Sequence, residues 1–317
     1  MRMRNIQARV GNFLLPASSD TWLALLRVGL GLQIILYSLS LRSDWNRLFA
    51  EDGNALISRD FMEAILDVHS HAIPRIGWLV AIGAHFGLSE ATVLFSTWTA
   101  LFCAGCCLLL GIFSRAAAIA AWFLHLCAVM SGNLMSYGMD NFTTIGLFYL
   151  MLAPLPDSYT LDQRIWKPKP KDPHFHGLFR RALQLHLCVI YFFSGLAKCL
   201  GAGWWNGTSL WRSLTSPPFN ILPLEVLVKG KYVFAIAGLC IWLLEISYPV
   251  LIWPKRTRPI WLAGILALHV ATGLTMGLHL FALIMIVLNL AAFGPGISRK
   301  ESEATDQGIP RSVPVTV

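Results

Sequence analysis

Long apolar segments are the feature that most constrains how this chain can fold. A helix that crosses a bilayer needs about 20 mostly apolar residues, because lipid cannot pair with backbone polar groups. Eight segments have this character, with approximate bounds 22–41, 91–111, 116–131, 140–156, 182–200, 232–253, 259–276 and 279–294. We therefore predict an all-α integral membrane protein with eight transmembrane helices.

Composition excludes several other classes of protein. Of the residues, 56% are hydrophobic and 13% are charged, whereas a soluble domain carries about 25% charged residues. So little charge cannot cover a water-soluble surface, which excludes a cytosolic globular enzyme, a disordered protein and a fibrous repeat. The net charge is +8, but the basic residues lie in short loops without clustered aromatic residues, so we expect no binding to nucleic acid.

Two parts of the apolar pattern are shorter than the rest. Segment 76–88 follows the polar stretch 42–75, and we predict that it forms an interfacial or re-entrant helix. The last two predicted spans are short and share the turn Met276-Gly277-Leu278. They either cross the membrane separately or form a hairpin that stops short of the far side.

Loop charge predicts the orientation of the chain. Loops on the cytoplasmic side of a membrane protein collect Lys and Arg. With the N-terminus inside, the inner segments hold sixteen of these residues and the outer segments hold seven. We therefore predict a multi-pass protein of the inner (plasma) membrane with both termini in the cytoplasm.

The same pattern divides the chain into three parts. Residues 1–20 form a cytoplasmic tail, residues 21–295 form one membrane domain, and the polar residues 296–317 form a disordered cytoplasmic tail. Within the membrane domain, segment 157–181 has three prolines among its lysines. Such a segment favours an extended cytoplasmic connector between two halves of four spans each.

Ionisable residues inside the apolar segments are the candidates for function. A charge near the bilayer centre costs at least about 2.5–3.5 kcal/mol, so it is expected to have a partner or a task. Eight side chains have this position: Arg27, His125, Asp140, His186, Lys198, Glu245, His269 and His279.

Lys198 ends a polar stripe on an apolar helix. Gln184, Tyr191, Ser194 and Lys198 have the spacing of one helix face, and such a stripe is expected to face a cavity or the bundle interior. The alternative is a lysine that extends to the outer interface beside aromatic residues. If the lysine is functional, an apolar cavity would let it serve as a base near neutral pH.

The predicted topology brings other polar residues near Lys198. Asp140 starts its span after Asn133 in the outer turn, His279 lies at the outer end of its span, and His269 lies mid-span. These side chains are expected to line one outward-facing pocket. Alternatively, Asp140 caps its helix and pairs with a basic neighbour, while the histidines are hydrogen-bond donors satisfied within the core. No metal-binding motif is present, so we expect no metal.

Two short motifs resemble a known family. The helix that ends Gly195-Leu196-Ala197-Lys198 is followed by Trp204-Trp205-Asn206-Gly207. This order, G-x-x-K and then W-x-x-G, resembles the HTTM superfamily, which is the membrane domain of vitamin K-dependent gamma-carboxylases and their bacterial relatives. Segments 26–31, 49–53, 132–141 and 147–150 also resemble the family, so the likeness covers approximately residues 20–295.

The resemblance implies a reaction. In the carboxylase this lysine deprotonates vitamin K hydroquinone, which makes Lys198 the implied base. Glu245 and His269 match its acidic residue and histidine, so Glu245 would hold the polar network and His269 would orient the hydroquinone oxygen. The implied cofactor is reduced vitamin K or a menaquinol-like hydroquinone, and the implied activity is that of a carboxylase- or epoxidase-like lyase. The expected pocket residues are Asn133, Asp140, Tyr191, Trp204, Trp205, Glu245 and His279.

The sequence also departs from the carboxylase. It has no counterpart of the large lumenal C-terminal domain that binds the propeptide, so carboxylation of a dedicated protein substrate lacks support. It is similar in length to stand-alone bacterial members, including SdpB-type proteins, which share the lysine and a histidine ahead of a Met-Gly turn. The expected partners are the lipid bilayer, a quinone and a peptide or protein substrate.

The second hypothesis is therefore a non-catalytic membrane factor for maturation or export of a peptide. In that role Lys198 would be a charge partner of Asp140 or Glu245. The two hypotheses differ in geometry. A free base needs its nearest acid several ångströms away, whereas a charge partner needs a close carboxylate.

Overall fold

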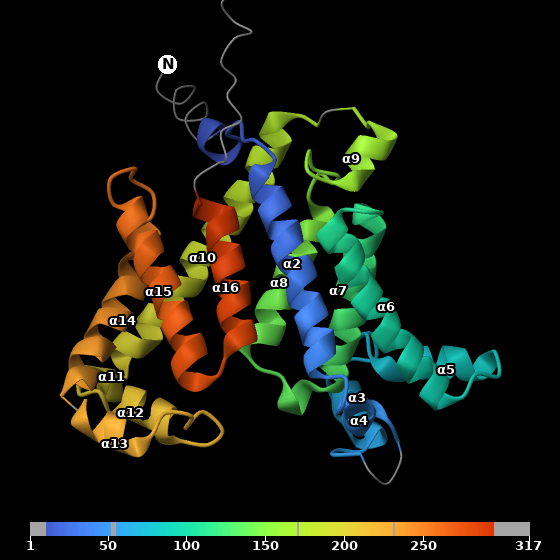
Figure 1. Cartoon of the computed structure of the whole chain (residues 1–317), viewed down its shortest axis with the longest axis horizontal. Coiled ribbons are helices and arrows are strands. Elements are labelled where there is room, and N and C mark those ends of the chain that lie inside the picture. Colours follow the sequence, from blue (N-terminus) through green and yellow to red (C-terminus); the bar gives the residue numbers. More distant parts are fainter. Residues whose placement is uncertain (1–10, 52–54, 170, 231, 295–317) are drawn as a thin grey trace, which may run out of the picture.

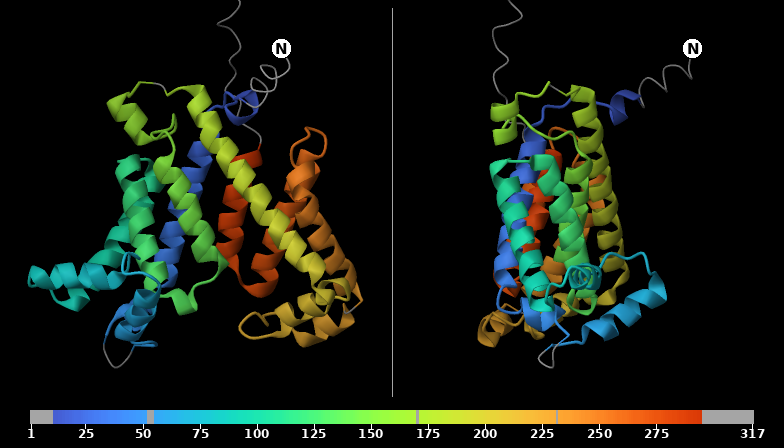
Figure 2. Two further views of the ribbon diagram at one scale, coloured as in Figure 1. Left: turned by 180° about the vertical axis from the view of Figure 1, so that it is seen from behind. Right: turned by 90° about the vertical axis from the view of Figure 1, so that its right-hand side faces the viewer.

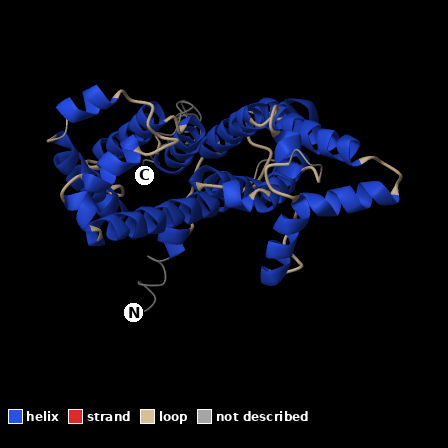
Figure 3. Ribbon diagram, turned by 90° about the horizontal axis from the view of Figure 1, so that it is seen from below, coloured by secondary structure: helices blue, strands red, loops and turns tan. Residues whose placement is uncertain are grey.

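The computed structural model describes residues 11–51, 55–169, 171–230 and 232–294. All regular elements in these ranges are helices, and the same residues contain no strand (Figure 3). The predicted all-α class is therefore confirmed for this part of the chain. The expectations for residues 1–10 and for the tail 296–317 lie outside the described residues.

The helices follow one another along the chain with short connections. Their bounds are α2 (Thr21–Ser40), α3 (Trp45–Phe49), α4 (Arg59–His69), α5 (Ile76–His85), α6 (Glu90–Leu110), α7 (Ser114–Ser131), the 3-10 helix η1 (Asn133–Met135), α8 (Gly138–Leu152), α9 (Leu161–Trp166), α10 (Pro173–Leu200), α11 (Ala202–Trp205), α12 (Thr208–Thr215), α13 (Leu224–Lys229), α14 (Val233–Leu251), α15 (Arg258–Met276) and α16 (His279–Phe293).

Among the residues that the structure describes, six helices are long and apolar enough to cross a membrane, namely α2, α6, α7, α10, α14 and α15. The other two predicted spans correspond to α8 and α16, which have 15 residues each. Such a helix is about 22 Å long, shorter than the hydrocarbon core of about 30 Å. The eight predicted segments thus correspond, within the described residues, to six candidate spans and two shorter helices of the bundle (Figure 1).

The short helix α16 lies at the centre of the bundle. It packs against α2 and α8 on one side and against α10 and α15 on the other. Nine of its residues are buried. The long α10 runs obliquely across the back of the bundle and reaches α14 (Figure 2). Through α10 and α16, residues from both halves of the chain meet in one interior.

Helix α10 begins earlier than the sequence pattern predicted. The helix starts at Pro173, so the predicted connector 157–181 ends at Asp172 and also contains α9. The Asp172 side chain caps the helix by accepting a hydrogen bond of 2.9 Å from the His174 N–H. Proline is favoured at the first helical position, where its missing N–H is not needed. The extended connector predicted for residues 173–181 was therefore wrong.

Short helices gather at the end of the bundle opposite residues 11–20 and α9. They are α3, α4 and α5 beneath the first half and α11, α12 and α13 beneath the second (Figure 1). Helix α5 projects sideways, and its Ile82 and the following Phe86 are exposed. A helix outside the bundle favours the interfacial alternative predicted for segment 76–88.

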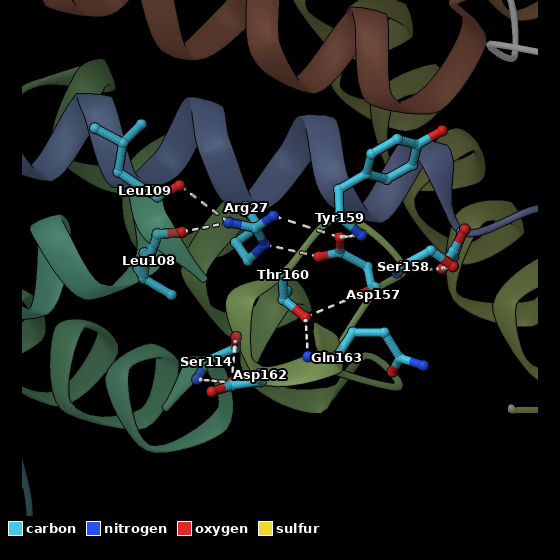
Figure 4. Close-up of polar contacts among 11 residues, drawn as sticks. Arg27, Leu108, Leu109, Ser114, Asp157, Ser158, Tyr159, Thr160, Asp162 and Gln163 are labelled. Atoms are coloured by element: carbon cyan, nitrogen blue, oxygen red, sulfur yellow. Dashed lines mark hydrogen bonds and ion pairs between the residues drawn. The ribbon is translucent and has the colours of Figure 1, made fainter. Parts of the chain in front are cut away.

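A buried ion pair joins the elements at the other end (Figure 4). The Arg27 guanidinium donates to both carboxylate oxygens of Asp157, at 2.7 and 3.3 Å, and to the Leu108 carbonyl oxygen at 2.6 Å. Both charged side chains are almost fully buried. Because Leu108 lies in the last turn of α6, the arginine also compensates the negative end of that helix dipole.

Asp162 caps the next helix beside this pair. Its carboxylate accepts hydrogen bonds of 2.7 Å from the Phe113 N–H, the Ser114 N–H and the Ser114 hydroxyl at the start of α7. The two carboxylates lie on the segment that follows α8. Together they fasten α2, α6 and α7 to that segment.

We predict that replacing Arg27 alone is strongly destabilising. Arg27→Met leaves the Asp157 carboxylate buried without its cation, which costs about 3–5 kcal/mol. The double variant Arg27→Met/Asp157→Asn removes both charges, and we expect it to recover most of the loss. The free energy of unfolding in detergent micelles measures both effects. Equal stability of Arg27→Met and wild type would contradict this role for the pair.

Candidate functional site

Lys198 forms an ion pair at the opposite end of the bundle. It lies in the last turn of α10, and its Nζ donates to Glu245 Oε2 on α14 at 2.7 Å and to Ser194 Oγ at 2.6 Å. The lysine side chain is 20% exposed and the glutamate side chain 7%. The lysine and the carboxylate therefore form a charge-assisted hydrogen bond.

A glycine allows this pair to form. A Cβ atom at Gly195 would lie 2.5 Å from the Ile246 backbone nitrogen, so only glycine lets α10 and α14 approach so closely. Ile246 is the neighbour of Glu245, and Lys198 lies one helical turn beyond Gly195. The G-x-x-K motif thus brings the lysine within reach of the carboxylate.

The W-x-x-G motif positions an aromatic ring beside the same lysine. The Nζ of Lys198 lies 5.3 Å from the centroid of the Trp204 ring, which is the geometry of a cation–π contact. Gly207 has φ +81°, and a Cβ atom there would lie 2.5 Å from the Ala235 nitrogen of α14. Gly207 therefore lets the chain turn tightly against α14 and holds Trp204 in place.

A second polar cluster lies next to the ion pair. Tyr191 on α10 and His269 on α15 are hydrogen bonded through the hydroxyl and Nε2 at 2.8 Å. Asn289 on α16 donates from Nδ2 to the Tyr191 hydroxyl at 2.7 Å, and Tyr248 on α14 donates to Asn289 Oδ1 at 2.8 Å. All four side chains are buried. Sequence reasoning missed Tyr248 and Asn289, although an amide in the apolar run of α16 was a visible signal.

Both clusters contribute to one cavity. Its volume is about 230 Å³, and an apolar cavity of about 150 Å³ already accommodates benzene. Polar atoms from Tyr191, Ser194, Lys198, Glu245 and His269 line one part of it. The remaining wall is mostly apolar, with Phe142, Ile190, Trp204, Leu210, Ser213, Ile241, Leu268, Thr272, Met276, Phe281 and Met285. The cavity has room for a small aromatic ring system beside an ion pair.

Six residues predicted from sequence therefore meet in this cavity. They are Tyr191, Ser194, Lys198, Trp204, Glu245 and His269. Of the predicted polar stripe, Gln184 alone turns elsewhere, and its side chain donates to the Ala292 carbonyl oxygen at 2.7 Å.

Asp140 lies in a different place. Its carboxylate accepts a hydrogen bond of 2.9 Å from the Tyr137 N–H and so caps α8, as the predicted alternative expected. The basic partner of that alternative is not found among the described residues. It also lines a second cavity of about 170 Å³ together with Tyr37. The structure does not bring Asp140 into the cavity that contains Lys198.

Three further predicted residues lie outside the lining of the Lys198 cavity. Trp205 donates from Nε1 to the Cys199 carbonyl oxygen at 2.7 Å. Asn133 starts the 3-10 helix η1, and His279 is the first residue of α16.

The chain matches the sequence profile of a known protein family. The sequence profile of the HTTM domain matches residues 80–295. The chain belongs to the HTTM family. No curated protein and no solved structure gives a significant match. The part matched to the HTTM domain includes every residue that lines the Lys198 cavity, so the cavity is built within the family's own domain.

We predict that Gly195→Ala separates Lys198 from Glu245. The added methyl group would meet backbone atoms of α14, and overpacking of this kind costs about 1–3 kcal/mol. The coupling energy between Lys198 and Glu245, measured by a double-mutant cycle of unfolding free energies, is expected to fall toward zero. Gly230→Ala is the matched control, because a Cβ atom there makes only ordinary contacts at 3.7 Å. A coupling energy unchanged by Gly195→Ala would contradict the assigned packing.

Proposed function

We propose that this HTTM protein binds a hydroquinone-like molecule in the Lys198 cavity and that Lys198 and Glu245 together remove a proton from its hydroxyl group. The observation that carries the proposal is the ion pair on the cavity wall. Charges at membrane depth are costly and mark functional sites. The volume of about 230 Å³ and the mainly apolar wall fit reduced vitamin K or a menaquinol-like ring, which are the ligands implied by the sequence resemblance.

In this proposal both members of the pair take part in the proton transfer. Because Glu245 Oε2 lies 2.7 Å from its Nζ, Lys198 is proposed to act together with this carboxylate. It accepts a proton at Nζ as it passes its own proton to the Glu245 carboxylate. A bound hydroquinone supplies the hydroxyl proton. The pair then holds one additional proton, on Glu245, and the Lys198 ammonium balances the negative charge left on the ligand.

The cavity is proposed to face outward. It lies near the bundle end that holds α11 and α12, opposite residues 11–20 and α9 (Figure 1). The distribution of Lys and Arg in the loops predicts that this end is outside the inner (plasma) membrane and that both termini are cytoplasmic. A ligand would then reach Lys198 from the outer leaflet or the outer surface.

The second candidate function is a non-catalytic membrane factor that helps a peptide mature or be exported. The specific observation in its favour is the carboxylate 2.7 Å from the lysine, which is the geometry expected of a charge partner. In that case the pair would hold α10 and α14 in register. Buried ion pairs have this use in some proteins.

One experiment separates these candidates. We predict that wild-type protein in lipid nanodiscs supports oxygen consumption that depends on 1,4-naphthohydroquinone and exceeds the protein-free rate. Lys198→Ala and Glu245→Gln are each expected to lower the rate of this oxygen consumption by about 10²–10⁴-fold, the contribution typical of general acid–base catalysis.

The control is Lys198→Met/Glu245→Leu, which removes both charges and keeps apolar packing. The proposal predicts a folded protein without activity. Full activity in this folded double variant would contradict a catalytic pair. Wild-type protein that is folded but does not consume oxygen with the hydroquinone would favour the peptide factor.

A further inference from the structure

A second cavity lies among the ends of α2 and α7 and the starts of α8 and α16. It has a volume of about 170 Å³, and Asp140, Tyr37 and Tyr137 line it beside apolar side chains such as Leu280. This Asp140 cavity is at the same end of the bundle as the Lys198 cavity, near α3 and η1 (Figure 1). The two cavities share no lining residue, so they are distinct.

Asp140 is a buried acid that lacks a cation. The residue is only 6% exposed, and no described Lys, Arg or His side chain pairs with it. Its Oδ2 accepts the Tyr137 N–H, whereas Oδ1 accepts no hydrogen bond from another described residue. The positive end of the α8 dipole offsets only part of the cost of burying a charge. A cationic group in the cavity would supply the missing compensation.

Tyr37 gives the cavity a second polar group. Its ring packs against the ring of His125 with centroids 4.8 Å apart, and the residue is only 5% exposed. Its hydroxyl has no hydrogen-bond partner among the described residues. The hydroxyl is not fully enclosed by protein atoms, and Tyr37 lines the Asp140 cavity. Because buried hydroxyl groups are normally hydrogen bonded, this group points to a ligand that can donate to it.

We propose that the Asp140 cavity binds a primary ammonium group, carried by a free amine or by a lipid headgroup, with Asp140 as its counter-ion and the Tyr37 hydroxyl as a hydrogen-bond acceptor. An ammonium group has three donors and no acceptor, which matches two side chains whose oxygen atoms lack donors. The rest of the wall is mostly apolar and suits a short alkyl chain. A cavity of about 150 Å³ accommodates benzene, so the available volume limits the ligand to a small group.

This site is separate from the one proposed for the hydroquinone. The first turn of α16 lies between the two cavities, because Leu280 lines the Asp140 cavity and Phe281 lines the Lys198 cavity. Phe281 packs against Phe142 of α8, with ring centroids 6.0 Å apart. An amine would therefore bind beside the hydroquinone site, and its binding can be measured without any hydroquinone.

Isothermal titration calorimetry of the whole protein in phosphatidylcholine nanodiscs tests the site. The probe is n-butylammonium, and n-butanol is the matched molecule of similar length without the charge. We expect saturable binding of n-butylammonium and no saturable binding of n-butanol at the same concentrations. Folded wild-type protein that does not bind n-butylammonium, or that binds both molecules equally, would overturn the proposal.

Three variants assign the contacts. Asp140→Asn keeps an oxygen that can accept from the Tyr137 N–H but removes the charge, so we expect affinity for n-butylammonium to fall about tenfold or more. Tyr37→Phe removes only the hydroxyl, and we expect a smaller loss of about threefold. Asp60→Asn is the control, because Asp60 is an exposed acid of α4 that does not line the cavity, and the affinity should stay unchanged.

Unchanged affinity in folded Asp140→Asn would overturn the site. If that variant does not fold, Tyr37→Phe decides, and wild-type affinity in Tyr37→Phe would then contradict the proposal. Nanodiscs that contain phosphatidylethanolamine distinguish the two sources of the ammonium group. Weaker binding of n-butylammonium in these nanodiscs supports the lipid headgroup as the ligand, whereas equal binding in both lipids supports a free amine.

Discussion

The cost of a charge at membrane depth is the constraint on which this structure depends. Two ion pairs, one toward each end of the bundle, offset this cost. Arg27 pairs with Asp157 across 130 residues of sequence, and Lys198 pairs with Glu245 across 47 residues. The first pair joins α2 to the segment that follows α8, and the second joins α10 to α14.

The two pairs differ in what surrounds them. The Arg27 pair is closed, because carbonyl oxygens of α6 and both carboxylate oxygens occupy the guanidinium. The Lys198 pair instead lines a cavity, and one fifth of the lysine side chain is exposed. An ion pair therefore stabilises the packing at one end of the bundle. At the other end, an ion pair places polar groups beside a ligand-sized cavity.

Much of this could be predicted from sequence, because it depends on local properties. Apolar length predicted the helices, and periodicity predicted that Tyr191, Ser194 and Lys198 share a face. The early start of α10 was missed because Pro173 was interpreted as part of an extended segment rather than as the first residue of a helix. Asn289 and Tyr248 were missed for a different reason. Their partners lie 98 and 41 residues away, and only helix packing brings them together.

The protonation state of Glu245 with ligand bound tests the proposed proton transfer most directly. Infrared difference spectra, recorded with ¹³C-labelled glutamate on addition of 1,4-naphthohydroquinone, report the carboxyl group. We expect a new protonated-carboxyl band that shifts with the label and disappears in Glu245→Gln. Deprotonation of the bound hydroquinone with Glu245 still a carboxylate would contradict the central claim.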